Sequence, residues 1–212
     1  DTPCTIVKPL MCVWPHEAPD ETRKVTLRFE KGNCVALDGK EMSPLDMMLT
    51  ANDLAGAYGI GLKNALENRV IGTKSRGVYE APGLELLATG LRYVYQATMD
   101  RRSTGLFHTM SRVVAEQIYD GRLFDPPART SLAGMEVLAE YATGTVELSM
   151  YRGHLYFQKL SDCPHSLYNE ADSSMEASDG LNPASSQGYV EVQAVEATAI
   201  ARAGQVSVDM LR

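Results

Sequence analysis

Residues 24–38, KVTLRFEKGNCVALD, contain two short runs in which apolar and polar side chains alternate, on either side of Lys31-Gly32-Asn33. Alternation with a period of two is typical of strands that bury one face, and a glycine-containing break between two such runs indicates a hairpin. We therefore expect an antiparallel β-hairpin here. The same pattern predicts a second hairpin over 145–159, TVELSMYRGHLYFQK, with its turn at Arg152-Gly153.

The segment between the two hairpins has the features of helices. Ser43-Pro44 combines a favourable N-cap with a proline suited to the first turn, and it predicts a helix through LDMMLTANDLAGAY that ends at Gly59. Apolar side chains at helical spacing predict further helices over 84–99, over 105–120 and from Pro126-Pro127 to about Gly144. We interpret these apolar stripes as core.

The last fifty residues have a different composition. Residues 161–187 are rich in Ser, Asp, Asn and Pro, which predicts a long excursion across a surface, and GYVEVQ at 188–193 predicts a short strand. Residues 194–212 are rich in alanine with scattered apolar side chains. Such a terminal segment either frays or docks on a neighbouring subunit, and composition leaves both open. The predicted order is strands, then helices, then strands, and it contains no alternating βαβ units. This order predicts an α+β fold with antiparallel sheets and a helical cluster.

Composition narrows the class of protein. Hydrophobic residues make up 44% of the 212 residues and charged residues 22%, which is typical of a globular domain. The net charge of −7 argues against a surface for nucleic acid or an anionic membrane, and no apolar stretch approaches the roughly 20 residues that cross a bilayer. The start, DTPCTIVKPLMCVW, has neither an initiator Met nor a signal-peptide pattern, so we expect part of a longer protein.

The cysteines do not suggest a metal site. Cys4, Cys12, Cys34 and Cys163 form no C-x-x-C pair, and the C-x₃-H pair of Cys12 and His16 has no second pair to match it. A structural zinc site needs four ligands, so we expect no metal in this chain and free thiols in a reducing cytoplasm.

A nucleotide site is not expected in this chain either. GIGLK at 59–63 resembles a fragment of a glycine-rich loop, but the sequence contains neither G-x-x-x-x-G-K-[ST] nor G-x-G-x-x-G. It follows a predicted helix, so we interpret it as a helix cap and turn.

Residues 67–83, ENRVIGTKSRGVYEAPG, have no clear helix or strand period. Lys74-Ser75-Arg76-Gly77 places two cations around a hydroxyl beside a glycine, an arrangement that can bind a carboxylate or phosphate. Glu67 and Tyr79 flank it and can serve an ammonium or amide group. The segment is therefore either a site for a zwitterion or a solvated loop held by salt bridges.

This segment closely resembles a signature of argininosuccinate synthases, E-N-R-x-[IV]-x-x-K-S-R-G-x-Y-E-[TA]-P-G. Further segments match the family in order and spacing, and together they cover most of 23–193: VTLRFEKGNCVALDGKEMSP, ANDLAGAYGIGLKNALENR, TMDR at 98–101, GRLFDP at 121–126 and CPHSLYNEA at 163–171.

The resemblance implies a reaction. In this family the ureido oxygen of citrulline attacks the α-phosphate of ATP, which is bound with Mg²⁺, and the products are pyrophosphate and citrullyl-AMP. The amine of aspartate then displaces AMP. An N-terminal domain binds the nucleotide, and a second, α+β synthetase and multimerisation domain ends in a tail that reaches across a tetramer. The chain resembles this second domain, so we expect the domain over 1–193, an oligomerisation tail over 194–212, a cytoplasmic homotetramer and no activity without the nucleotide domain.

The resemblance also implies roles for individual residues. Glu67 and Tyr79 match the family's citrulline contacts. Four further signature positions are expected to shape the loop or pair with carboxylates as much as to contact substrate: Arg69, Lys74, Ser75 and Arg76. The chain departs from the family at Lys63, Asn64 and Leu91 and in the tail beyond 194, and these departures bear on local packing and tetramer contacts more than on the citrulline contacts. A non-catalytic module that binds an amino acid or mediates oligomerisation remains the alternative.

Overall fold

The structure is a computed structural model that describes residues 2–170 and 182–206. The chain forms two compact units, Asp1–Leu167 and Tyr168–Arg212. The first unit contains both sheets and four of the α-helices, and it confirms the predicted α+β class. The second unit contains the helix α6, Pro183–Arg202.

The main sheet of the first unit has five antiparallel strands in the order β3-β2-β1-β6-β7. Their bounds are Arg23–Glu30 for β1, Asn33–Leu37 for β2, Lys40–Glu41 for β3, Gly144–Tyr151 for β6 and His154–Ser161 for β7. Both predicted hairpins are confirmed. Their turns place Lys31-Gly32 and Arg152-Gly153 at positive φ, the geometry that suits the right-handed twist of paired strands.

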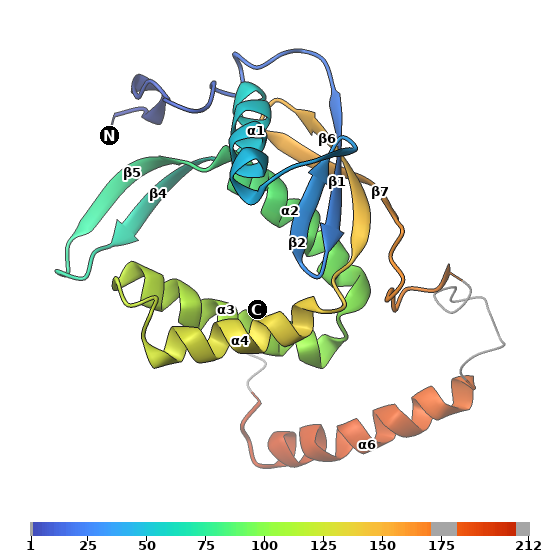
Figure 1. The fold of residues 1–212 in the computed structure, drawn as a ribbon. Helices are drawn as coiled ribbons and strands as arrows, with labels where there is room; N and C mark the ends of the chain where they lie inside the picture. The colour runs from blue at the N-terminus through green and yellow to red at the C-terminus, as the bar shows by residue number, and fades with distance from the viewer. Residues whose placement is uncertain (1, 171–181, 207–212) are drawn as a thin grey trace. The chain divides into compact units, whose positions relative to one another are not determined.

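Helices α1, Pro44–Ala57, and α2, Pro82–Thr98, cover one face of this sheet (Figure 1). The alternating apolar residues of β1 and β6 point into the core against both helices: Val25, Leu27, Phe29, Val146, Leu148 and Met150. Gly90 lets α2 approach closely, because a Cβ there would lie 2.7 Å from Cδ1 of Leu27. The predicted helices at these two places are confirmed, and α1 begins at its predicted N-cap, where the amide of Asp46 donates to the Ser43 hydroxyl.

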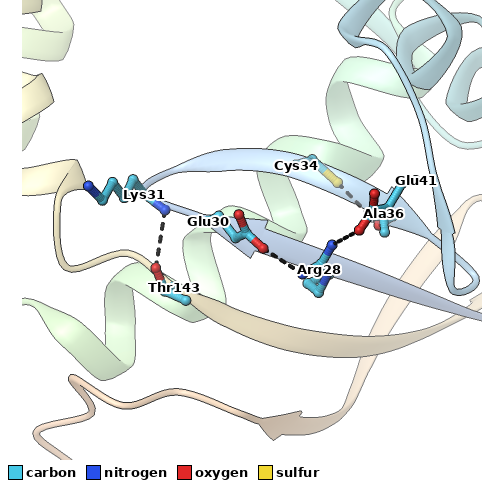
Figure 2. A network of polar contacts seen from close by, with 7 residues as sticks. All are labelled: Arg28, Glu30, Lys31, Cys34, Ala36, Glu41 and Thr143. Atoms are coloured by element: carbon cyan, nitrogen blue, oxygen red, sulfur yellow. Dashed lines mark hydrogen bonds and ion pairs between the residues drawn. The ribbon is translucent and has the colours of Figure 1, made fainter.

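The other face of the sheet carries polar side chains (Figure 2). Arg28 pairs with both Glu30 and Glu41 and so links β1 to β3, while the amide of Lys31 donates to the hydroxyl of Thr143, 3.1 Å away. These ion pairs are exposed, and each contributes about 0–1 kcal/mol. The sheet is therefore half-buried, which explains why its strands alternate so clearly in the sequence.

Helices α3, Arg101–Tyr119, and α4, Pro126–Ala139, pack against each other. Helix α3 begins earlier than its apolar stripe predicts, because the Asp100 carboxylate accepts hydrogen bonds from the first amides of the helix. Helix α4 ends before the predicted Gly144, which already belongs to strand β6.

Three predictions from the sequence are wrong. The apolar stripe over 105–120 is not core, because helix α3 has no buried residue. The segment 67–83 is not a loop: β4, Leu62–Asn68, and β5, Lys74–Glu80, form a separate two-stranded antiparallel sheet. The predicted strand at 188–193 lies inside α6, which Asn182 caps through a hydrogen bond from the amide of Ala184. This helix also continues through the predicted boundary between 193 and 194.

Two further local predictions are confirmed in part. Residues 59–61 of GIGLK form a turn, with Gly59 and Gly61 at positive φ, and Leu62 and Lys63 already belong to β4. Of the predicted excursion over 161–187, residues 162–169 have no regular helix or strand, and 171–181 lie outside the described residues. Residues from Pro183 onward belong to helix α6. No helix within the described ranges combines the length and apolar character that a membrane span requires.

Candidate functional site

The β4–β5 hairpin carries all six residues predicted for the site (Figure 1). Its register pairs Glu67 with Ser75 and Lys63 with Tyr79. Because side chains alternate between the two faces of a strand, these four residues belong to one face of the hairpin. The opposite face carries Asn64 and Asn68 from β4 and Lys74 and Arg76 from β5.

Glu67 is the centre of the first face. The phenol of Tyr79 donates a hydrogen bond to Oε1 of Glu67 at 2.7 Å, and the hydroxyl of Ser75 donates to the same oxygen at 3.2 Å. Within the part of the chain that the structure describes, Oε2 of Glu67 receives no hydrogen bond. This oxygen is therefore available to a donor from a ligand.

The hydrogen bond to Glu67 also fixes what Tyr79 can offer. It raises the pKa of the Tyr79 phenol above its ordinary value, with smaller contributions from burial and from the negative charge of Glu67. The phenol thus donates its proton to Glu67, and the Tyr79 oxygen can serve a ligand only as an acceptor. Glu67 and Tyr79 together form a surface of hydrogen-bond acceptors, which suits a ligand rich in N–H groups.

The other signature residues do not gather around Ser75 as a cradle for an anion. The ammonium of Lys74 donates to Oδ1 of Asn68 at 2.8 Å, on the face away from Glu67. The guanidinium of Arg76 donates to Oδ1 of Asn64 at 3.0 Å and to the carbonyl oxygen of Thr2 at 2.7 Å. These contacts connect the two strands of the hairpin and link it to the N-terminal segment.

Arg69 lies where β4 leads into the loop of the hairpin. Its amide donates to the carbonyl oxygen of Thr73, and its side chain is exposed. The positive charge of Arg69 opposes the rise in the pKa of Tyr79.

Glu80, at the end of β5, was not predicted as a functional residue. Its carboxylate accepts hydrogen bonds from three successive backbone amides, at 2.7 Å from Leu10, 2.6 Å from Met11 and 2.8 Å from Cys12. Burial raises the pKa of the Cys12 thiol to about 11, and the charge of Glu80 adds to this rise. Glu80 therefore anchors residues 10–12 at the base of the hairpin that carries Glu67 and Tyr79. The sequence gives no local signal for this contact, since the partners lie about seventy positions away.

The residues that the structure describes include no group of three or more His, Cys, Asp or Glu side chains that could hold a metal ion. All four cysteines are free thiols.

Comparison with known proteins identifies similar sequences over most of the chain. Residues 10–200 match the model of the arginosuccinate synthase C-terminal domain family. The chain is 38% identical over 183 residues to an argininosuccinate synthase of Rhodopirellula baltica, covering 86% of this chain and 45% of the relative. It is 37% identical over 183 residues to the chloroplastic argininosuccinate synthase of Arabidopsis thaliana, with 86% and 37% covered.

A third relative, an argininosuccinate synthase of Leptospira biflexa, is 35% identical over 196 residues, with 92% of this chain and 48% of the relative covered. The chain thus spans less than half the length of these curated relatives.

Proposed function

Because the chain belongs to the family of arginosuccinate synthase C-terminal domains, we propose that it supplies the citrulline contacts of an argininosuccinate synthase. The proposed enzyme is a ligase of arginine biosynthesis that joins citrulline to aspartate at the expense of ATP. The observation that carries the proposal is the pairing of Glu67 and Tyr79, in which one carboxylate oxygen and the phenol oxygen are left as acceptors.

Citrulline fits this surface because it is rich in donors. Its ammonium group and its ureido nitrogens all carry N–H groups, and a carboxylate that accepts from a charged donor forms one of the stronger hydrogen bonds found in proteins. In the proposed reaction the ureido oxygen attacks the α-phosphate of ATP, pyrophosphate leaves, and the amine of aspartate then displaces AMP. Glu67 and Tyr79 contribute by binding and orienting citrulline, which brings its oxygen into line for attack.

We assign ATP, its Mg²⁺ and much of the aspartate site to a nucleotide-binding domain outside this chain, as the resemblance implies. The protein that contains both domains is proposed to act in the cytoplasm as a homotetramer.

A pyrophosphate-release assay with ATP, citrulline and aspartate tests the function. We expect no turnover above background from the pure 212-residue chain, and turnover that depends on citrulline when the chain is fused to a synthase nucleotide-binding domain. Turnover by the isolated chain would contradict the assignment of ATP to another domain. A folded fusion that binds ATP but never turns over would favour the non-catalytic alternative.

We further propose that helix α6 mediates self-association. Four of its apolar side chains are more than 60% exposed in the single chain: Tyr189, Val190, Val192 and Val195. Burying these side chains against another subunit would remove apolar surface from water.

Deleting residues 182–212 from the fused enzyme should reduce a tetramer to a smaller species, measured by light scattering at equal protein concentration. The double substitution Val192→Ser and Val195→Ser should weaken the same association without shortening the chain. An oligomer of unchanged mass in both variants would contradict this role.

A further inference from the structure

Gly77 lies on β5 two residues before Tyr79, so the two positions share one face of the hairpin. A Cβ built on Gly77 would lie 2.8 Å from Cε2, 2.9 Å from Cζ and 3.0 Å from Oη of Tyr79. The phenol ring of Tyr79 therefore lies across the backbone of residue 77. Since the φ of Gly77 is not positive, its backbone suits any residue, and the ring of Tyr79 is the nearest obstacle to a side chain here.

The register of the hairpin explains why the ring takes this path. Glu67 is paired with Ser75, and Tyr79 lies four residues further along β5, which is about 13 Å in an extended strand. The two side chains meet only by leaning toward each other along the strands. Between them lies the cross-strand pair of Ala65 and Gly77, which are two of the smallest residues.

We infer that Gly77 is a positioning residue, which sets the Glu67–Tyr79 acceptor pair by leaving the space over β5 that the phenol needs. The inference deepens the proposed function and rests on it in one respect, because that pair is the proposed citrulline contact. Gly77 itself has no side chain to offer a ligand, so it acts entirely through Tyr79.

The substitution Gly77→Ala tests the positioning directly on the 212-residue chain. A methyl group at residue 77 should displace the ring and break the hydrogen bond to Glu67. Because that bond raises the pKa of Tyr79, the pKa should fall toward the ordinary tyrosine value in the variant. The titration of each phenol is followed by NMR with ¹³Cζ-labelled tyrosine, and Tyr79→Phe assigns the signal.

Gly105→Ala is the matched control, because a Cβ at this position of α3 meets nothing within 4 Å. It should leave the titration of Tyr79 unchanged. Glu67→Ala removes the acceptor altogether, so it should lower the pKa of Tyr79 without altering Gly77 and shows how far that pKa falls when the hydrogen bond is lost. If Gly77→Ala disturbs folding, the double variant Gly77→Ala with Tyr79→Ala should fold, because it removes the ring that the methyl group would meet. A pKa of Tyr79 that stays raised in a folded Gly77→Ala chain, or a double variant that is as unstable as Gly77→Ala, would overturn the inference.

Kinetics of the fused enzyme separate this inference from the proposed function. Gly77→Ala and Tyr79→Phe should each raise the KM for citrulline by about three-fold to ten-fold, as expected for one neutral hydrogen bond. The double variant should be no worse than either single variant, since both lose the same hydroxyl contact. A fall in the pKa of Tyr79 with no change in KM for either variant would support the positioning and reject the citrulline assignment.

Discussion

Replacing Glu67 with glutamine in the fused enzyme should raise the KM for citrulline by about ten-fold to a hundred-fold, the worth of one charge-assisted hydrogen bond. The KM values for ATP and aspartate should change much less. Glutamine keeps the shape, and its carbonyl oxygen can still accept from Tyr79 and Ser75 in place of Oε1. Its amide nitrogen then replaces Oε2, so that a donor faces the donors of the substrate.

A structural role for Glu67 makes a different prediction. Both partners of Glu67 lie on β5, so the carboxylate also bridges the two strands of the hairpin. If that bridge were the main role of Glu67, Glu67→Gln would lower the melting temperature and raise the KM values for all three substrates to a similar extent. Steady-state kinetics for each substrate, measured with a melting curve, distinguish the two roles. Glu41→Gln serves as a matched control, because Glu41 lies on the main sheet and its side chain is 78% exposed.

The strands that the sequence predicts best are those that bury one face. Residues 24–38 and 145–159 alternate clearly because Leu27 and Leu148 are buried in the core, while the neighbouring Thr26, Arg28 and Glu147 are partly exposed. The β4–β5 hairpin forms its own two-stranded sheet, and most side chains of this hairpin are polar or charged. Its Leu66 is 67% exposed. Without a buried face there is no apolar alternation, and the periodicity that identifies strands is absent.

Helix α6 was missed for a related reason. GYVEVQ alternates like a strand over six residues, but Asn182-Pro183 supplies an N-cap and a first-turn proline six residues earlier. A short alternating run does not determine the local structure when a capped, alanine-rich helix can form through it and on both sides of it.

The candidate site, too, can be predicted from the sequence only in part. The signature makes Glu67 and Tyr79 candidates for the site, whereas their hydrogen bond depends on the register of a hairpin that the sequence does not indicate. The contact of Glu80 with residues 10–12 joins segments that only the folded chain brings together.

Replacing Glu80 with alanine should lower the free energy of unfolding by about 2–3 kcal/mol, because three backbone amides lose a charged acceptor together. This value is smaller than the sum of three charge-assisted hydrogen bonds, because the amides of Leu10 and Met11 are exposed and can donate to water instead. The amide of Cys12 is partly buried, so the loss of its hydrogen bond should reduce the stability most. Glu136→Ala on the exposed side of α4 is the matched control, and thermal or urea unfolding gives the comparison.

The effect of Glu80 should also depend on pH in a defined direction. Burial raises the pKa of Glu80, but the hydrogen bonds from Leu10, Met11 and Cys12 lower it more, so the folded value is below the ordinary one. A carboxylate with a lowered folded pKa stabilises the protein fully above its unfolded pKa of about 4.3 and loses that contribution as the pH falls through the folded value. The stability difference between the wild-type chain and Glu80→Ala should therefore be largest near neutral pH and shrink below about pH 4.

Hydrogen exchange shows which part of the chain is destabilised in Glu80→Ala. If Glu80 holds residues 10–12 against the base of the hairpin, the amide of Cys12 should exchange faster in Glu80→Ala, while the amides of β1 and β6 in the core keep their protection relative to global unfolding. Equal exchange at Cys12 in the two proteins, together with equal stability at neutral pH, would mean that the N-terminal segment is held by its other contacts. The close approach of Met11 to Gly56 is the main alternative, because a Cβ at Gly56 would lie 2.1 Å from the carbonyl oxygen of Met11. Gly56→Ala would then release the segment where Glu80→Ala does not.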